Sequence, residues 1–209
     1  PSHDQRRQRI FAIIDYKKSG IFKFISTDTQ TVCQEGRIMT KGILLFCFDT
    51  KDTCYHKILE NCVRLIKKNL KLEITVITNF ETYKRIKPLG FINYKFIDPE
   101  LGNTKLGKEW HNVDRHLAYE LSPYDTTLVM DIDYFCFSDN LKKYLDTKYD
   151  FLIPSDAHDL TDRNTFSSRV WSMIPMVWAT VFIFRKTKKA KMLFDTIKYV
   201  KTFYSYFNE

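Results

Sequence analysis

Several features that would narrow the function are missing from this sequence of 209 residues. No apolar run approaches the ~18 to 20 residues that a membrane span requires. The longest runs, residues 43–48 and 181–184, have the length of strands. The chain opens without the apolar segment of a secretory signal, and it contains neither internal repeats nor low-complexity tracts. A hydrophobic fraction of 44% is ample for a core, so a folded protein without a membrane span is expected.

Cysteine motifs are also missing, because none of the five cysteines stands in a C-x-x-C pair. Cys47 and Cys136 lie within apolar, strand-like segments. This pattern predicts buried, reduced thiols in a cytoplasmic protein, with neither disulfides nor a zinc site.

The charge is strongly unbalanced, with a net charge of +8 and a pI near 9.1. Such a balance raises the hypothesis of a nucleic-acid-binding protein. A lysine-rich solvated surface is the default interpretation of this charge, and a basic balance also suits an enzyme whose donor is a nucleotide diphosphate. The last helical segment carries basic residues at near-helical spacing, which either meet DNA phosphates or form a solvated face: Lys188, Lys191, Lys198 and Lys201.

The first 38 residues differ from the rest of the chain. Two apolar segments, residues 10–15 and 21–26, flank a Lys-Lys-Ser-Gly turn and predict a hairpin. Met39 directly precedes an apolar strand and resembles a natural start. Residues 1–38 are therefore either an N-terminal extension or sequence translated from upstream. Residues 39–209 are expected to form one domain.

From Met39 onward, strand and helix patterns alternate, which predicts an α/β protein with a mostly parallel central sheet covered by helices. The expected strands are residues 42–48, 74–78, 94–97, 126–130, 151–153 and 176–184. The expected helices are residues 52–69, 81–87, 112–121, 139–145 and 187–207. The polar stretch 154–172 is long for a connection in a compact domain, so a functional loop is expected there.

Two carboxylates, Asp131 and Asp133, follow the apolar strand 126–130 directly. Residues two apart on a strand face the same side, so both carboxylates would point together if the strand continues that far. Ligands of open α/β sheets bind at the carboxyl ends of strands. Paired oxygen donors suit Mg²⁺ or Mn²⁺ beside a diphosphate. The alternative is two surface carboxylates that begin a turn.

The segment from Tyr119 to Asp133 (YELSPYDTTLVMDID) resembles the region around the D-x-D motif of GT-A glycosyltransferases. The segment from Leu44 to Thr50, with Tyr55, is similar to their first strand and nucleoside-binding loop. The whole pattern from Lys41 onward resembles small glycosyltransferases of phage and bacterial genomes. The resemblance implies a GT-A-like, Rossmann-type three-layer α/β/α sandwich that transfers a sugar from a nucleotide-diphosphate donor with the help of Mn²⁺ or Mg²⁺.

The resemblance also implies roles for individual residues. Asp131 and Asp133 would bind the metal, and Asp131 would alternatively touch the ribose of the donor. Three residues match the place that contacts base and ribose: Asp49, Thr50 and Tyr55. Arg115 matches a basic position near the phosphates or sugar of the donor. The structural alternatives are a helix-packing role for Tyr55 and a surface charge at Arg115 paired with Asp114 or Glu120.

The resemblance stops short of an acceptor-binding half, where GT-A enzymes carry a further metal ligand, often histidine. The sequence ends at Glu209 without such a half, which leaves a truncated chain as one interpretation. No catalytic residue can be assigned. The acceptor is a saccharide, a protein or a modified base in DNA, and a non-enzymatic nucleic-acid-binding protein is the rival hypothesis.

Overall fold

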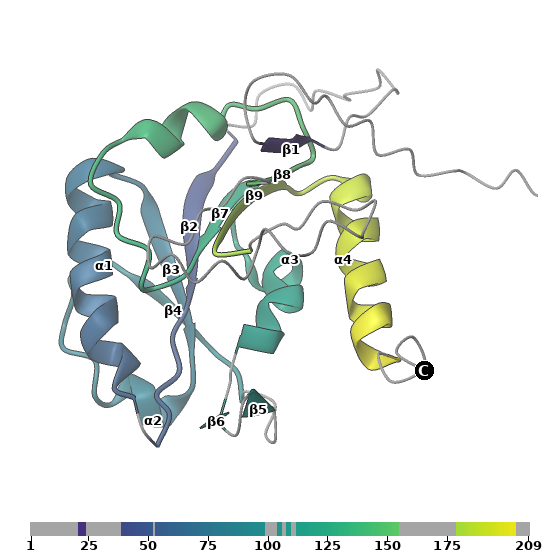
Figure 1. Cartoon of the computed structure of the whole chain (residues 1–209). Coiled ribbons are helices and arrows are strands. Elements are labelled where there is room, and N and C mark those ends of the chain that lie inside the picture. The colour runs from purple at the N-terminus through teal and green to yellow at the C-terminus, as the bar shows by residue number, and fades with distance from the viewer. Residues whose placement is uncertain are drawn as a thin grey trace, which may run out of the picture.

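The computed structural model describes residues 21–23, 39–51, 53–98, 104–105, 108–109, 112–154 and 179–203. Its centre is a seven-stranded sheet with the strand order β1-β8-β9-β7-β2-β3-β4 (Figure 1). The strands are β1 (Ile21–Lys23), β2 (Lys41–Phe46), β3 (Glu73–Thr78), β4 (Asn93–Phe96), β7 (Thr126–Met130), β8 (Phe151–Pro154) and β9 (Val181–Arg185). A separate two-stranded ribbon pairs β5 (Thr104–Lys105) with β6 (Lys108–Glu109).

The sheet is mostly parallel, as the sequence predicts. Strands β4, β3, β2 and β7 pair in parallel. Strand β9 is antiparallel to both β7 and β8, so β8 points the same way as β7. The central strands β2, β3 and β7 are buried over nearly their whole length, which explains their continuous apolar sequences.

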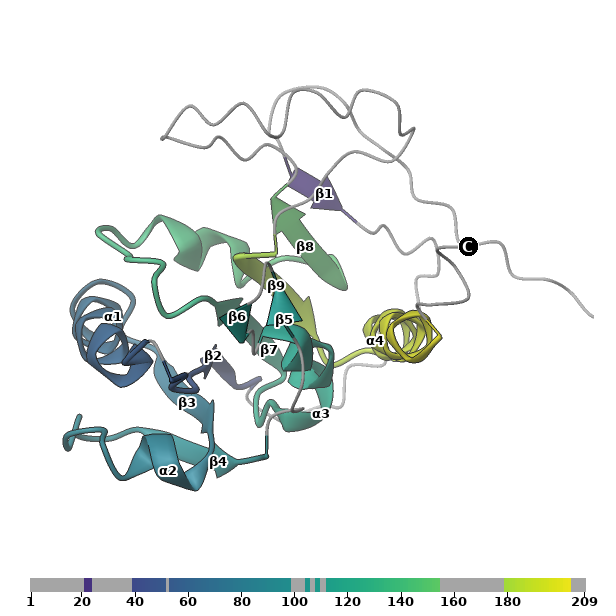
Figure 2. The same cartoon turned by 60° about the horizontal axis from the view of Figure 1, so that its bottom comes forward.

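Helices cover both faces of this sheet, which confirms the three-layer α/β/α arrangement (Figures 1 and 2). The helices are α1 (Tyr55–Asn69), α2 (Phe80–Tyr83), α3 (Ala118–Leu121) and α4 (Lys188–Thr202), with two 3-10 segments, η1 (Asn112–Leu117) and η2 (Asn140–Tyr144). Helix α1 lies on one face and contributes Leu59, Cys62 and Ile66 to its core. Helices α3 and α4 contribute Ala118 and Phe194 to the core on the other face.

The end elements differ from the sequence predictions. Strand β9 begins at Val181, because residues 179 and 180 form a turn, whereas the sequence predicts a strand from residue 176. Residues 176–178 lie outside the described part. Helix α4 ends at Thr202, five residues before the predicted end. It begins as predicted, since the Thr187 side chain accepts the Ala190 N–H at 3.2 Å and caps it.

The N-terminal segment joins the main sheet through β1. Ile21, Phe22 and Lys23 pair antiparallel with Pro154, Ile153 and Leu152 of β8. The predicted hairpin partner, residues 10–15, lies outside the described residues.

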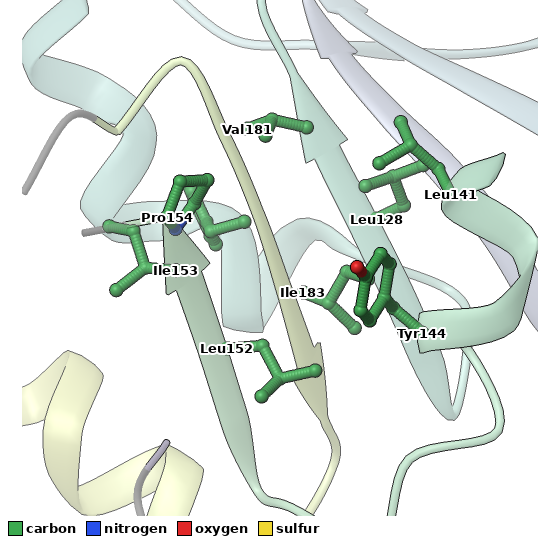
Figure 3. A pocket seen from close by; sticks show the side chains of 9 residues that line it. Leu128, Leu141, Tyr144, Leu152, Ile153, Pro154, Val181 and Ile183 are labelled. Atoms are coloured by element: carbon green, nitrogen blue, oxygen red, sulfur yellow. The ribbon is translucent and has the colours of Figure 1, made fainter. Parts of the chain in front are cut away.

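An apolar pocket lies on the α1 side of the sheet, between η2 and strands β7, β8 and β9 (Figure 3). Leu141 and Tyr144 of η2 face Leu128, Leu152 and Ile183 across it. None of the described residues that line the pocket carries a charge, so they offer no partner to a phosphate or a metal ion.

Candidate functional site

Polar residues follow the parallel strands at one edge of the sheet. The register of β2 and β7 pairs Leu45 with Met130, so Asp131 follows β7 beside the end of β2. Asp49 lies three residues beyond the end of β2, and Asn79 directly follows β3. Because β2, β3 and β7 are parallel and adjacent, their carboxyl ends bring these segments together. This edge is where the sequence predicts a ligand.

The two aspartates are presented by a turn rather than by a continuing strand. Strand β7 ends at Met130, and the Tyr134 N–H donates to the Asp131 carbonyl at 3.0 Å. The strand alternation assumed for the pair is therefore wrong at this point. Between them, Ile132 turns into the core below α1 and is 6% exposed. Its burial anchors the turn and leaves Asp133 exposed.

Arg115 binds the first aspartate of this turn. Its guanidinium forms an ion pair with Asp131 and donates to the Ala179 carbonyl at 2.7 Å. The Arg115 and Asp131 side chains are only 16% and 19% exposed. Burial lowers the pKa of Arg115 to about 10, while the nearby charge of Asp133 opposes the decrease. The ion-pair partner of Arg115 is therefore Asp131, the first predicted metal ligand, and not Asp114 or Glu120.

The donor set at this turn fits a hard divalent cation that also binds a substrate. Asp131 and Asp133 supply carboxylate oxygens, and Mg²⁺ is commonly held by one or two carboxylates together with substrate phosphates. Within the described ranges, no group of three or more His, Cys, Asp and Glu side chains could hold an ion by itself. Further ligands would have to come from the substrate or from parts of the chain outside those ranges.

Asp49 is the centre of a second, more enclosed group. Its carboxylate accepts the His56 backbone N–H at 3.0 Å and lies 2.7 Å from His56 Nδ1. Arg85 donates to the same carboxylate at 3.3 Å, and the Asp49 N–H donates to the Thr82 hydroxyl at 2.9 Å. The Asp49 side chain is 6% exposed. One residue thus ties the end of β2 to the start of α1 and to α2.

This arrangement also explains how α1 begins. Its N-cap residue, Cys54, makes no side-chain capping bond, and its first turn contains no acidic residue. Asp49 replaces both, because its carboxylate accepts a free N–H of the first turn and places negative charge at the positive end of the helix. Thr50 and Thr53 close the intervening segment: the Thr50 N–H donates to the Thr53 carbonyl, and the Thr53 N–H donates to the Thr50 hydroxyl, both at 3.1 Å.

Tyr55, the third predicted nucleoside contact, is the first residue of α1. It is half-buried and packs against the core on the α1 face. The packing role that the sequence allowed is therefore present.

Sequence reasoning missed His56 and Arg85. A histidine on an amphipathic helix and an arginine after a short helix carry no distinctive local signal. Their roles become visible only in the tertiary structure, where both contact the Asp49 carboxylate. Of the predicted functional loop, residues 154–172, only Pro154 belongs to the described part of the chain.

The basic stripe of α4 is partly neutralised. Lys191 pairs with Asp195 at 2.9 Å, and Lys198 lies 3.7 Å from Glu120. These pairs weaken the stripe as a phosphate-binding surface. None of the helices in the described part of the chain is long and apolar enough to cross a membrane.

Comparisons with known proteins agree with this architecture at the level of the fold. The sequence matches no family model, and no curated protein matches it. A structure of the galactosyltransferase LgtC in complex with donor and acceptor sugar analogs matches with a TM-score of 0.55 and 14% identity over 78% of this chain and 65% of LgtC. An active-site mutant of LgtC gives the same score over 64% of its chain.

The glycosyltransferase GlyE of Streptococcus pneumoniae TIGR4 matches with a TM-score of 0.46 and 13% identity, over 78% of this chain and 40% of GlyE. The chain thus spans less than two thirds of the length of these proteins. The chain has the fold of the GT-A glycosyltransferases.

Proposed function

We propose that this chain binds a nucleoside-diphosphate sugar at the carboxyl edge of β2, β3 and β7 and belongs to an enzyme that transfers the sugar. The carrying observation is the turn after β7, where Asp131 forms an ion pair with the buried Arg115 and Asp133 follows as an exposed carboxylate. The fold shared with a galactosyltransferase solved with donor and acceptor analogs supports the same reaction class.

Asp131 and Asp133 would hold the divalent cation, Mn²⁺ or Mg²⁺. When bound, the ion supplies positive charge that offsets the negative charge developing on the departing nucleoside diphosphate. Arg115 holds Asp131 in place from a rigid position, since it is also bonded to the Ala179 carbonyl. With a pKa of about 10 it stays protonated at neutral pH, so it adds a fixed cation beside the phosphates.

The nucleoside half of the site would lie at the segment after β2. Thr50 has a hydroxyl within the closed turn that can donate to a ribose oxygen while it accepts the Thr53 N–H. Tyr55 offers part of its ring to the base. Asp49 holds the segment that contains Thr50 and Tyr55 in place through its hydrogen bonds to α1 and α2.

Thermal unfolding of the full chain tests this proposal. We expect UDP, GDP or one of their sugar conjugates to stabilise the protein only when Mn²⁺ or Mg²⁺ is present. A ligand at a hundred times its Kd contributes about 2.7 kcal/mol, which corresponds to a rise in Tm of roughly 5–10 °C for a chain of this size.

Asp133→Ala is the decisive variant, because it removes an exposed carboxylate without creating a cavity. We expect it to abolish the metal-dependent rise. Asp139→Ala is the matched control, since Asp139 is also exposed, follows the same turn and makes no side-chain capping bond. An unchanged rise in Asp133→Ala would contradict the assigned metal site.

The candidate acceptors within this proposal are a saccharide, a protein and a modified DNA base. DNA binding that weakens steeply with salt, in a protein that binds no nucleotide, would instead favour the nucleic-acid-binding hypothesis.

A further inference from the structure

The contacts of Asp49 separate two tasks within the predicted nucleoside half. His56 donates its backbone N–H to one oxygen of the Asp49 carboxylate and places Nδ1 against the other, while Arg85 approaches that second oxygen as well. With three groups around it and 6% of its side chain exposed, Asp49 offers little surface to a ligand.

We propose that His56 is a positioning residue for nucleotide binding: through Asp49 it holds the Thr50–Thr53 turn and the start of α1 in the geometry that receives the nucleoside. The inference rests on the proposed donor site, which it deepens. Asp49 then acts as a support within the site, and the ligand meets Thr50 and Tyr55.

Of the two side chains that contact the Asp49 carboxylate, His56 holds it more firmly than Arg85 does. Its ring is buried, 11% exposed, and Nδ1 lies 2.7 Å from the carboxylate. Arg85 is 58% exposed and approaches only to 3.3 Å. A short, enclosed bond to a charged group holds its partner more firmly than an exposed ion pair, which water and salt weaken.

Loss of the His56 ring would leave Asp49 with its helix-capping bond and with the exposed Arg85. The carboxylate would then be free to rotate toward Arg85 and solvent, and the turn would lose its fixed support. A ligand would have to order the turn on binding, which lowers the apparent affinity by the fraction of molecules in the competent state.

The test uses three substitutions of His56 that differ in whether, and where, the new side chain places a hydrogen-bond donor. His56→Ala removes the side-chain donor. His56→Asn replaces the ring by a shorter amide whose nitrogen can occupy the place of Nδ1. His56→Gln has a side chain closer in length to histidine, but its amide lies near the place of Nε2 and not at the place of Nδ1, which contacts the Asp49 carboxylate. Arg85→Ala is the control for the exposed contact to the same carboxylate.

Isothermal titration with UDP and GDP in the presence of MnCl₂ measures the effect. We expect His56→Ala and His56→Gln to weaken nucleotide binding about tenfold, or about 1.4 kcal/mol. His56→Asn and Arg85→Ala should stay within about threefold of the unmodified protein. The melting temperature without ligand shows whether each variant folds, and if His56→Ala does not, the Asn and Gln pair decides.

The outcomes separate the two proposals. If the unmodified protein binds neither nucleotide, the donor site itself fails. If it binds and all His56 variants bind equally well, or Asn and Gln are equally impaired, His56 does not act through its Nδ1 contact and the inference is overturned. Tight binding by His56→Asn with weak binding by His56→Gln supports it.

Discussion

A methyl group added at Gly42 tests how tightly β2 is packed at its amino end, opposite the candidate site. A Cβ atom at this position would lie 2.3 Å from Cζ of Tyr124 and 2.4 and 2.5 Å from its two Cε atoms. Ordinary carbon contacts are ~3.5 to 4.0 Å. The ring cannot move away freely, because Tyr124 is 2% exposed and its hydroxyl lies 2.8 Å from the Thr75 hydroxyl.

The magnitude follows from these contacts. Overpacking of this kind costs about 1–3 kcal/mol, and displacement of the ring loses a buried hydrogen bond of about 1 kcal/mol. The lower entropy of the unfolded alanine chain returns about 0.4–1 kcal/mol. Gly42→Ala should therefore lower the free energy of unfolding by about 2 kcal/mol and Tm by roughly 4–8 °C.

Urea denaturation followed by circular dichroism measures this loss, and the slope m should not change. The double variant Gly42→Ala/Tyr124→Leu supplies the control, because leucine lacks all three atoms that the methyl group would meet. Its loss should be smaller than the sum of the two single losses by about 1 kcal/mol or more. A Gly42→Ala protein as stable as the parent, or strictly additive losses, would refute the packing argument.

Two further predictions concern thiols and the site. Cys33 is first replaced by serine, so that the four described cysteines can be compared with one another. In this variant, Ellman's reagent at pH 8 should label the exposed Cys54 rapidly. Cys47, Cys62 and Cys136 should react only after unfolding, because burial raises the thiol pKa, to about 12 for Cys62 and about 11 for Cys136; rapid labelling of a second thiol would contradict this. Arg115→Lys should lower the free energy of unfolding by about 1 kcal/mol in urea denaturation and weaken metal-dependent nucleotide binding. The reason is that one ammonium cannot replace a guanidinium that contacts both Asp131 and the Ala179 carbonyl. A variant that keeps both its stability and its nucleotide binding would show that the two guanidinium contacts are not needed.

The buried strands of this protein could be predicted because their signals are local. Residues 126–130 form β7 with the predicted bounds, and β2 and β3 lie within two residues of theirs. A continuous apolar run has one stable environment in an α/β protein, between two layers of helices. The position of Asp131 at the end of β7 followed from the same signal.

The contacts at the site depended on the tertiary structure. Asp49 meets Arg85 only because β2 and β3 are neighbours, and Arg115 meets Asp131 only because η1 passes the end of β7. The join of β1 to β8 links residues 21 and 154, which no local pattern relates.

The sequence by itself therefore determined which segments are buried and where the two carboxylates follow a strand, because apolar patterning and chain order act over a few residues. Only the tertiary structure decided that a turn presents those carboxylates, that Arg115 stands beside them, and that His56 holds Asp49. Such contacts join residues on different elements, and strand order and packing set their distances.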